Sequence, residues 1–191
     1  MKIGLYFGSF NPIHIGHLLV AIHIREAANL DEIWFIVSPQ NPFKKNVDLA
    51  PENHRLEMVK LAIEPISNFK VLDIEFNLPK PSYTHLTLKE LKKNYPKYDF
   101  KLIIGADNIE KFHEWKETEW IQKNVEILVY NRNKNQASSV NNQDNYFKIQ
   151  NLPLLDISST EIRNRIKENK SILYFIPEKV ENYIVDNQIY L

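Results

Sequence analysis

Two short stretches of the chain carry residue types that bind phosphate. The first is GSFNPIHIGH, residues 8–17, which holds the glycines Gly8 and Gly16 and the histidines His14 and His17. The histidines are three positions apart, so they share a face if the stretch ends in the first turn of a helix. A helix N-terminus presents unpaired N–H groups and a partial positive charge, which suit an anion. Two imidazoles there could stabilise a polyphosphate whose charge grows during a reaction.

Glycine is scarce in this chain, with four among 191 residues, where average usage would give about 13. Three of them, Gly4, Gly8 and Gly16, lie within the first sixteen positions, and the fourth is Gly105. We expect Gly8 to let the backbone turn sharply off a strand, and Gly16 to leave room for a phosphate or base beside a helix. Gly4 falls inside a predicted strand, where glycine is usually unfavourable.

The second stretch is ISSTEIRNRI, residues 157–166. Ser158 and Glu161 fit a capping box, so the stretch could simply be a well-capped helix. It could also bind phosphate, because hydroxyls, N–H groups and a guanidinium one turn later would lie at the same helix N-terminus. The residues that could make these contacts are Ser159, Thr160 and Arg163.

Several other chemistries are disfavoured by what these stretches lack. Neither contains G-x-G-x-x-G or G-K-[ST], which argues against a dinucleotide oxidoreductase and a P-loop kinase. The two histidines could chelate zinc or merely cap the helix. Zinc is disfavoured because the chain has no cysteine and no carboxylate nearby completes a site.

Strand and helix patterns alternate along the chain and place both stretches at strand-to-helix junctions. Parallel strands with intervening helices indicate an α/β class, a doubly wound and mostly parallel sheet of Rossmann type, formed by one domain over residues 1–191. Helices from about residue 158 complete the domain, and the polar stretch 131–145, with six Asn, is expected to be a surface loop. The predicted strands are 2–8, 32–39, 69–76, 99–107, 125–132 and 151–157. The predicted helices begin near residues 14, 51, 83, 108, 158 and 177.

Composition excludes further classes of protein. Lys and Arg together number 24, as do Asp and Glu, so the formal net charge is zero. This argues against a dedicated nucleic-acid binder. No apolar run approaches the length of a membrane span, and the N-terminus lacks the apolar region of a signal peptide. We therefore expect a cytoplasmic protein without nucleic-acid or membrane partners.

Together the two stretches resemble the HIGH-motif nucleotidyltransferase superfamily, and within it the nicotinate-nucleotide adenylyltransferases. The signature is His14-Ile15-Gly16-His17, paired with the late ISSTEIR. Class I aminoacyl-tRNA synthetases share the HIGH signature, but this chain is short and has no obvious anticodon or editing domain. The resemblance extends over nearly the whole chain. Supporting stretches are SPQNPFK, HRLEM, PSYTHLTL, IIGADN, the region around Trp115, and the ending IPEKVENYI.

The resemblance implies a Rossmann-like enzyme of NAD biosynthesis. Such an enzyme transfers the adenylyl group of ATP to nicotinate mononucleotide and releases pyrophosphate. Its partners would be ATP and a pyridine mononucleotide, with Mg²⁺ held mainly by ATP and no metal site on the protein. The sequence leaves open whether the protein forms a homo-oligomer. Two alternatives also stay open: another acceptor, such as nicotinamide mononucleotide, phosphopantetheine or flavin mononucleotide, and a non-catalytic nucleotide-binding module.

The resemblance also implies roles for individual residues. The catalytic set would be His14, His17, Lys44 and Arg163. ATP and its phosphates would contact Gly8, Ser9, Phe10, Gly16, Ser159, Thr160 and Arg163. Gly105 and Asp107 would lie against the nucleotide ribose, and Thr84 and Trp115 would surround nicotinate mononucleotide.

Some of these positions have simpler interpretations. Trp115 could be a packing residue at a helix edge, Asp107 could cap a helix, and Lys44 could be a solvated surface lysine. The chain also departs from the family where Phe43 replaces the histidine of Pro-Pro-His-Lys, and a phenyl ring can neither hydrogen-bond nor carry charge. The preference for nicotinate over nicotinamide rests on the resemblance alone.

Overall fold

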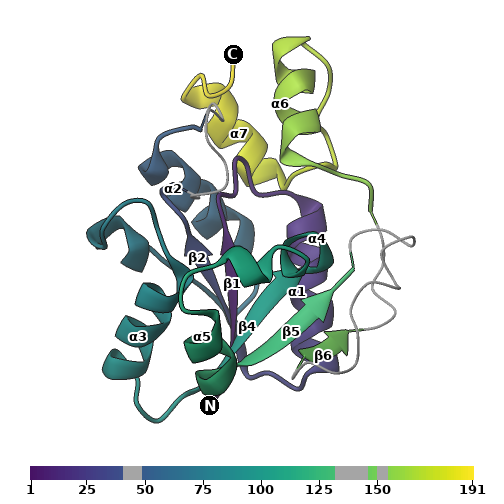
Figure 1. Ribbon diagram of the computed structural model, residues 1–191. Coiled ribbons are helices and arrows are strands. Elements are labelled where there is room, and N and C mark those ends of the chain that lie inside the picture. The colour runs from purple at the N-terminus through teal and green to yellow at the C-terminus, as the bar shows by residue number, and fades with distance from the viewer. Residues whose placement is uncertain (41–48, 132–145, 150–154) are drawn as a thin grey trace.

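Six strands form one sheet in the computed structural model, which describes residues 1–40, 49–131, 146–149 and 155–191 (Figure 1). The strand order is β3-β2-β1-β4-β5-β6, and every neighbouring pair is parallel. This is the order of the doubly wound Rossmann fold. The predicted fold class is confirmed, with a sheet that is parallel throughout rather than mostly. The strands are β1 Lys2–Gly8, β2 Glu32–Val37, β3 Phe69–Leu72, β4 Asp99–Gly105, β5 Glu126–Tyr130 and β6 Tyr146–Ile149.

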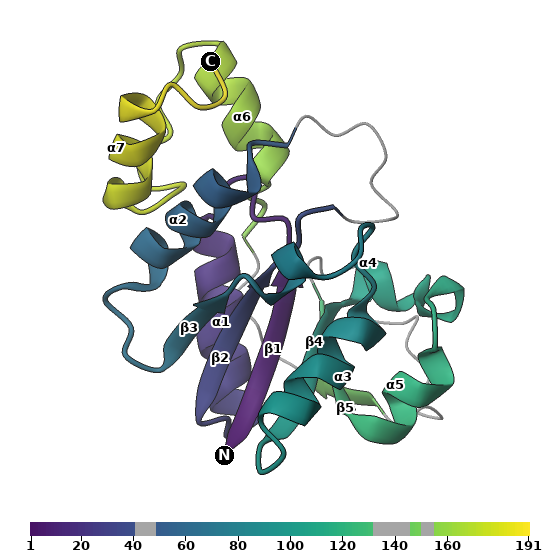
Figure 2. The same cartoon turned by 90° about the vertical axis from the view of Figure 1, so that its left-hand side faces the viewer.

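Helices cover both faces of the sheet (Figure 2). On one face α1, α2, α6 and α7 pack over a cluster that includes Ile33 and Phe35 of β2, and on the other α3 and α5 pack over Trp34 and Ile36. Burial on both sides explains why the central strands are continuous apolar runs. The helices are α1 Ile15–Ala27, α2 Glu52–Ile63, α3 Thr84–Asn94, α4 Ala106–Ile109, α5 Thr118–Asn124, α6 Ser159–Lys167 and α7 Glu178–Asp186, with short 3₁₀ turns η1 Ile74–Asn77 and η2 Phe112–Glu114.

Gly4 lies in the middle of β1 beneath side chains from two neighbouring strands. A Cβ at this position would lie 2.7 Å from the Cδ1 atoms of Ile33 and Leu30, and 2.9 Å from Cδ1 of Ile103. No glycine in the described chain has a positive φ. Gly4 is therefore a packing requirement of the core.

The strand order reverses between β1 and β4, which places a topological switch point at the centre of the sheet. In open α/β sheets, ligands bind in the crevice outside the carboxyl ends of the strands at such a point. The loop from β1 to α1 begins there, and α6 and α7 lie beyond the same end of the sheet (Figure 1). None of the helices that the structure describes is long and apolar enough to cross a bilayer.

Two predicted strands differ from the structure. The third stops at Leu72 and gives way to η1, in which Glu75 is buried and accepts a hydrogen bond from Thr87. The strand predicted over 151–157 is wrong in its described part, 155–157, and the sixth strand instead covers Tyr146–Ile149. Only Ile149 of that edge strand is buried, so its sequence lacks the apolar run that marks the central strands.

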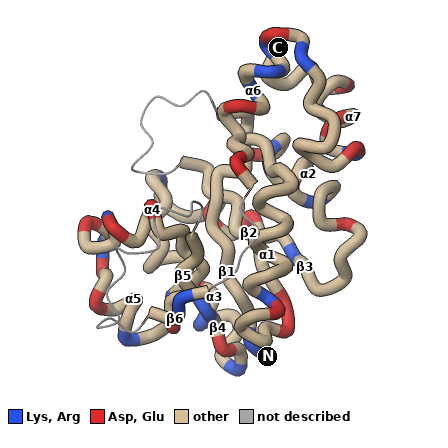
Figure 3. Tube along the Cα trace, turned by 90° about the vertical axis from the view of Figure 1, so that its right-hand side faces the viewer, with Lys and Arg blue, Asp and Glu red and all other residues tan. Residues whose placement is uncertain are grey.

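Charges of both signs are interspersed over the surface of the described residues (Figure 3). Most of their ion pairs join exposed side chains, such as Lys80 with Glu52 at 2.8 Å. Such pairs contribute little to stability, on the order of 0–1 kcal/mol each. We therefore look for interactions that stabilise the site among its buried polar groups rather than among surface ion pairs.

Candidate functional site

The loop that follows β1 is shaped by a buried aromatic residue. Phe10 has a φ of 44°, in the left-handed region, and only 2% of its surface is exposed. Its ring packs on Tyr6 and Phe35, with centroids 5.8 and 5.6 Å away. A Cβ on Gly8 would lie 2.7 Å from this ring. The expectation that Gly8 supplies the sharp turn is wrong, because the strained residue is Phe10 and Gly8 makes room for its ring.

His14 and His17 lie together at the start of α1. Their ring centroids are 3.7 Å apart, as their spacing predicted. The Nδ1 atom of His17 accepts a hydrogen bond of 3.3 Å from the backbone N–H of His14. A neutral His17 therefore carries its proton on Nε2, where it is a donor. Gly16 keeps this arrangement open, because a Cβ there would lie 3.0 Å from the His14 ring.

The second stretch reaches the first across the site. Ser158 caps α6, accepting a hydrogen bond of 3.1 Å from the backbone N–H of Glu161, so the capping interpretation is confirmed for this residue. The next turn contacts the first loop. Ser159 Oγ donates to the carbonyl of Pro12 at 2.9 Å, and Arg163 Nη1 donates to that of Asn11 at 2.8 Å. These contacts join positions about 150 residues apart and make one site of the two motifs.

Arg163 also donates from Nη2 to the Thr160 hydroxyl at 3.3 Å. The guanidinium is partly buried between α6 and the loop, with one edge on a carbonyl and the other on a hydroxyl. Arg163 therefore has a fixed orientation before any ligand arrives. A planar donor fork held in this way is suited to phosphate oxygens.

Sequence reasoning missed Arg55 of α2, whose side chain makes four hydrogen bonds at this end of the sheet. Its side chain is 1% exposed. It donates to the carbonyl oxygens of Ala50 at 2.8 Å, Ser9 at 2.7 Å, Ser38 at 2.7 Å and Pro39 at 3.1 Å. Arg55 thereby joins the loops that follow β1 and β2. The stretch HRLEM contained this residue, but a helix pattern alone does not tell a buried arginine from an exposed one.

Burial lowers the pKa of Arg55, while Tyr190 and Glu52 partly counter this effect. Arginine nevertheless stays protonated in proteins. A second clamp adjoins it, because Asn11 Oδ1 accepts hydrogen bonds from the Ala50 N–H at 3.0 Å and from the Tyr190 hydroxyl at 2.8 Å. The loop that follows β1 is thus held by the buried cation of Arg55 and by Tyr190 near the C-terminus.

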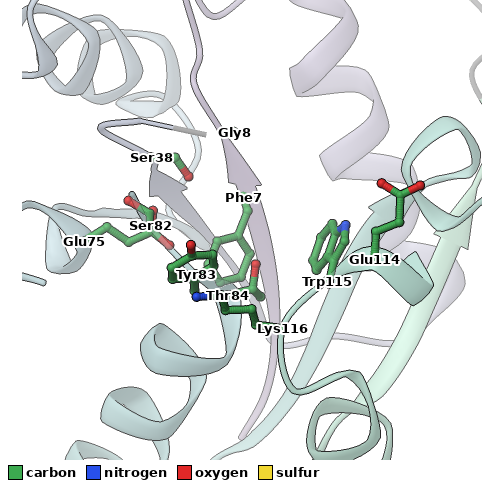
Figure 4. Close-up of a pocket in the computed structure, with 10 residues that line it drawn as sticks. All are labelled: Phe7, Gly8, Ser38, Glu75, Ser82, Tyr83, Thr84, Glu114, Trp115 and Lys116. Atoms are coloured by element: carbon green, nitrogen blue, oxygen red, sulfur yellow. The ribbon is translucent and has the colours of Figure 1, made fainter. Parts of the chain in front are cut away.

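A cavity of about 280 Å³ opens beside this loop, at the ends of β1 and β2 (Figure 4). Thr84, the first residue of α3, and Trp115, which follows η2, both line it. The indole is half-buried and packs on Phe112, with ring centroids 5.3 Å apart, so part of it is left to face a ligand. The cavity is lined by Phe7, Gly8, Ser38, Glu75, Ser82, Tyr83, Thr84, Glu114, Trp115 and Lys116.

Glu75 is a second buried charged residue that the sequence did not single out. It is 1% exposed, and its Oε1 accepts a hydrogen bond of 2.8 Å from the Thr87 hydroxyl. Burial raises the pKa of the Glu75 carboxyl, and the hydroxyls of Thr87, Ser38 and Ser82 oppose this more weakly. The hydrogen bond to Thr87 thus joins η1 to α3, the helix that begins at Thr84.

The remaining predicted residues are at the same end of the sheet or outside the described chain. Gly105 ends β4 and Asp107 lies in the first turn of α4, next to the switch point. Lys44 and Phe43 lie outside the described residues, as does the Asn-rich stretch from 132 to 145. Among the described residues, no three His, Asp or Glu side chains are grouped as a protein metal site would require.

Comparisons with known proteins agree with this geometry. A family model described as cytidylyltransferase-like matches residues 5–165. A Flavobacterium johnsoniae protein named "probable nicotinate-nucleotide adenylyltransferase" is 47% identical over 100% of this chain and 99% of its own, and a Cytophaga hutchinsonii protein of the same name is 47% identical over 100% and 98%. The Plasmodium falciparum nicotinic acid mononucleotide adenylyltransferase, solved with NaAD, has a TM-score of 0.80 at 25% identity, covering 99% of this chain and 97% of that one.

Proposed function

Because this chain belongs to the nicotinate-nucleotide adenylyltransferase family, we propose that it transfers the adenylyl group of ATP to nicotinate mononucleotide. The products are nicotinate adenine dinucleotide and pyrophosphate, and the reaction is a step of NAD biosynthesis. One observation carries the proposal: Ser159 and Arg163 of α6 hydrogen-bond to the loop that precedes the HIGH helix, beside a cavity lined by Thr84 and Trp115. This arrangement offers a phosphate site and an acceptor site side by side.

The reaction is a direct displacement at phosphorus. An oxygen of the acceptor's 5′-phosphate attacks the α-phosphorus of ATP, a new P–O bond forms, and the bond from the α-phosphorus to the bridging oxygen breaks as pyrophosphate leaves. The nucleophile is already an anion, so neither a general base nor a covalent intermediate is needed. Catalysis then consists of positioning the two substrates and stabilising charge.

The residues divide this work. His17 donates from Nε2 to the phosphates that become pyrophosphate, and the N-terminus of α1 adds its partial positive charge. His14, Lys44 and Arg163 offset the repulsion between the two polyanions. Gly8, Ser9 and Phe10, with Gly16, Ser159 and Thr160, shape the phosphate site, and Gly105 and Asp107 contact the ribose. ATP enters as its Mg²⁺ complex, in which phosphates and water hold the ion.

The test is an assay of pyrophosphate release with protein, ATP, Mg²⁺ and nicotinate mononucleotide. We expect steady turnover, and competition among acceptors should show the nicotinate compound to be the preferred one. No pyrophosphate at micromolar enzyme, with circular dichroism verifying the fold, would contradict the proposal. Tight ATP binding without pyrophosphate from any acceptor would instead indicate a nucleotide-binding module. Location in the cytoplasm and assembly into a homo-oligomer stay predictions.

A further inference from the structure

The acceptor cavity has an asymmetric distribution of charge. Lys116 is the single cationic side chain among the described residues that line it, and two carboxyls, Glu75 and Glu114, line it as well. Glu75 is buried against the Thr87 hydroxyl. Figure 4 shows the Glu114 carboxylate on the far side of the indole of Trp115 from Lys116. The indole of Trp115 therefore lies between the positive charge and the Glu114 carboxylate.

The Lys116 ammonium rests on the face of an aromatic ring. Its Nζ atom lies 4.0 Å from the centroid of the Tyr83 ring, and the described residues give it no ion pair. A cation–π contact orients an ammonium but leaves its N–H donors for other partners. The residue is exposed at the mouth of the cavity, so an incoming ligand can reach those donors.

The same contact places the ammonium at the start of α3. Tyr83 is the N-cap of this eleven-residue helix, and Thr84 is its first residue. The helix N-terminus adds a partial positive charge, and the Thr84 hydroxyl is a further hydrogen-bond donor on the cavity wall. Three features that favour an anionic group thus adjoin one another at one side of the cavity, beside an indole on which a pyridine ring could stack.

We propose that the Lys116 side chain selects acceptors whose pyridine ring bears a carboxylate over the neutral carboxamide analogues. This inference rests on the proposed function. A carboxylate would accept a charge-assisted hydrogen bond from the ammonium. A carboxamide in the same place would accept a hydrogen bond through its carbonyl oxygen, but this bond to a neutral acceptor is weaker and leaves the ammonium without a counter-charge. Lys116 is a specificity residue and does not contact the reacting α-phosphorus.

The experiment compares two acceptors in four proteins: wild type, Lys116→Met, Lys116→Arg and the control Lys111→Met. Lys111 is an exposed lysine of the same connecting segment that does not line the cavity. The specificity constant kcat/KM is measured for nicotinate and nicotinamide mononucleotides at saturating MgATP. We expect Lys116→Met to lower the value for the nicotinate compound about tenfold. The value for the nicotinamide compound should change by less than about threefold, and Lys116→Arg and Lys111→Met should keep the wild-type preference.

Two results would overturn the proposal. Equal losses for both acceptors would mean that Lys116 contacts a group they share, such as the 5′-phosphate, or only shapes the cavity. No loss for either would exclude a role in binding. Calorimetric binding of each mononucleotide to the same proteins gives a second measure of preference that needs no turnover. Absence of pyrophosphate from the wild type would therefore refute the proposed function, while the affinity ratio would still decide the role of Lys116.

Discussion

The loop that follows β1 and the cavity lined by Thr84 and Trp115 are built in different ways. The loop is held through its backbone: Arg55, Ser159 and Arg163 all donate to its carbonyl oxygens. The part of the cavity formed by Tyr83, Trp115 and Lys116 is built on contacts between side chains, with Lys116 over Tyr83 and Trp115 against Phe112. Bonds to carbonyls fix the path of the loop whatever its side chains are, whereas ring and cation contacts change with each substitution. The first arrangement suits a site of fixed shape and the second a selective pocket.

The difference has an energetic meaning for catalysis. Donors that already point to where charge develops need no reorganisation during the reaction, and this preorganisation is usually the largest contribution to rate. A pocket for the acceptor only has to hold that substrate in line with the α-phosphorus of ATP. The contacts of such a pocket therefore affect affinity and the choice of substrate more than the rate of the chemical step. Substitutions at the two regions should therefore differ in both size and kind.

The largest effect is expected from His17→Ala. The substitution removes a donor whose orientation is set by the His14 N–H, and loss of one transition-state donor typically lowers kcat about 100-fold or more. Steady-state pyrophosphate release measures it, and the loss should be the same for every acceptor. His23→Ala is the matched control, since His23 bonds the Leu19 carbonyl further along the same helix. Near-normal turnover of His17→Ala would remove this residue from the mechanism.

Much of this architecture is predictable from the sequence because its signals are local. The central strands are continuous apolar runs, and α2, α6 and α7 begin directly after Pro51, Ser158 and Pro177. The convergence of Ser159 and Arg163 on the first loop follows from the topology, since both motifs start helices at the carboxyl end of one sheet. Thr84 and Trp115 came from family resemblance, and the structure brings them to the same cavity.

What the sequence could not reveal depends on contacts between distant segments. Arg55 and Glu75 look like surface charges in a one-dimensional pattern, but each is 1% exposed. Gly8 and Gly16 were correctly placed beside the loop, yet their neighbours are the Phe10 and His14 rings, which only a folded chain identifies. The edge strand β6 escaped detection because it buries one residue.

Arg55→Met tests whether the loop depends on its clamp. Four carbonyl oxygens lose their donor, so we expect the free energy of unfolding to fall by about 2 kcal/mol, measured by urea denaturation. The KM for ATP should rise as well, because the carbonyl of Ser9 is released. Lys60→Met on the same helix removes only an exposed pair with Glu57 and should change stability little. A variant as stable as wild type with an unchanged KM would show that the loop is held without Arg55.

Gly16→Val is a more localised disturbance of the same region. A Cβ at this position meets the His14 ring at 3.0 Å, so the larger side chain must displace the imidazole. We expect kcat/KM for ATP to fall about tenfold, since small displacements of a catalytic group are costly, while the thermal midpoint changes little. Gly16→Ala should give a smaller loss of the same kind. A large fall in midpoint with normal kinetics would assign Gly16 to folding alone.

The smallest effect is expected at the acceptor end, from Glu75→Gln, and it appears in the pH dependence of stability. The pKa of Glu75 is raised by burial, so the folded protein binds its proton more tightly than the unfolded chain does. Its contribution to stability is fully present below the unfolded pKa and is lost as pH rises through the folded pKa. Glutamine does not titrate, so the variant should gain stability relative to wild type as pH rises across that window.

Urea denaturation of both proteins at a series of pH values and constant ionic strength measures this difference. Glu75→Asp is the control, because it keeps a titrating carboxyl and should retain a slope of the same sign even if the shorter side chain lowers stability at every pH. A difference between wild type and Glu75→Gln that stays constant with pH would show that the carboxyl is ionised in the folded protein as readily as in the unfolded chain. The hydroxyls of Thr87, Ser38 and Ser82 would then offset the effect of burial on the pKa of Glu75, and the cavity that Lys116 also lines would carry a full negative charge.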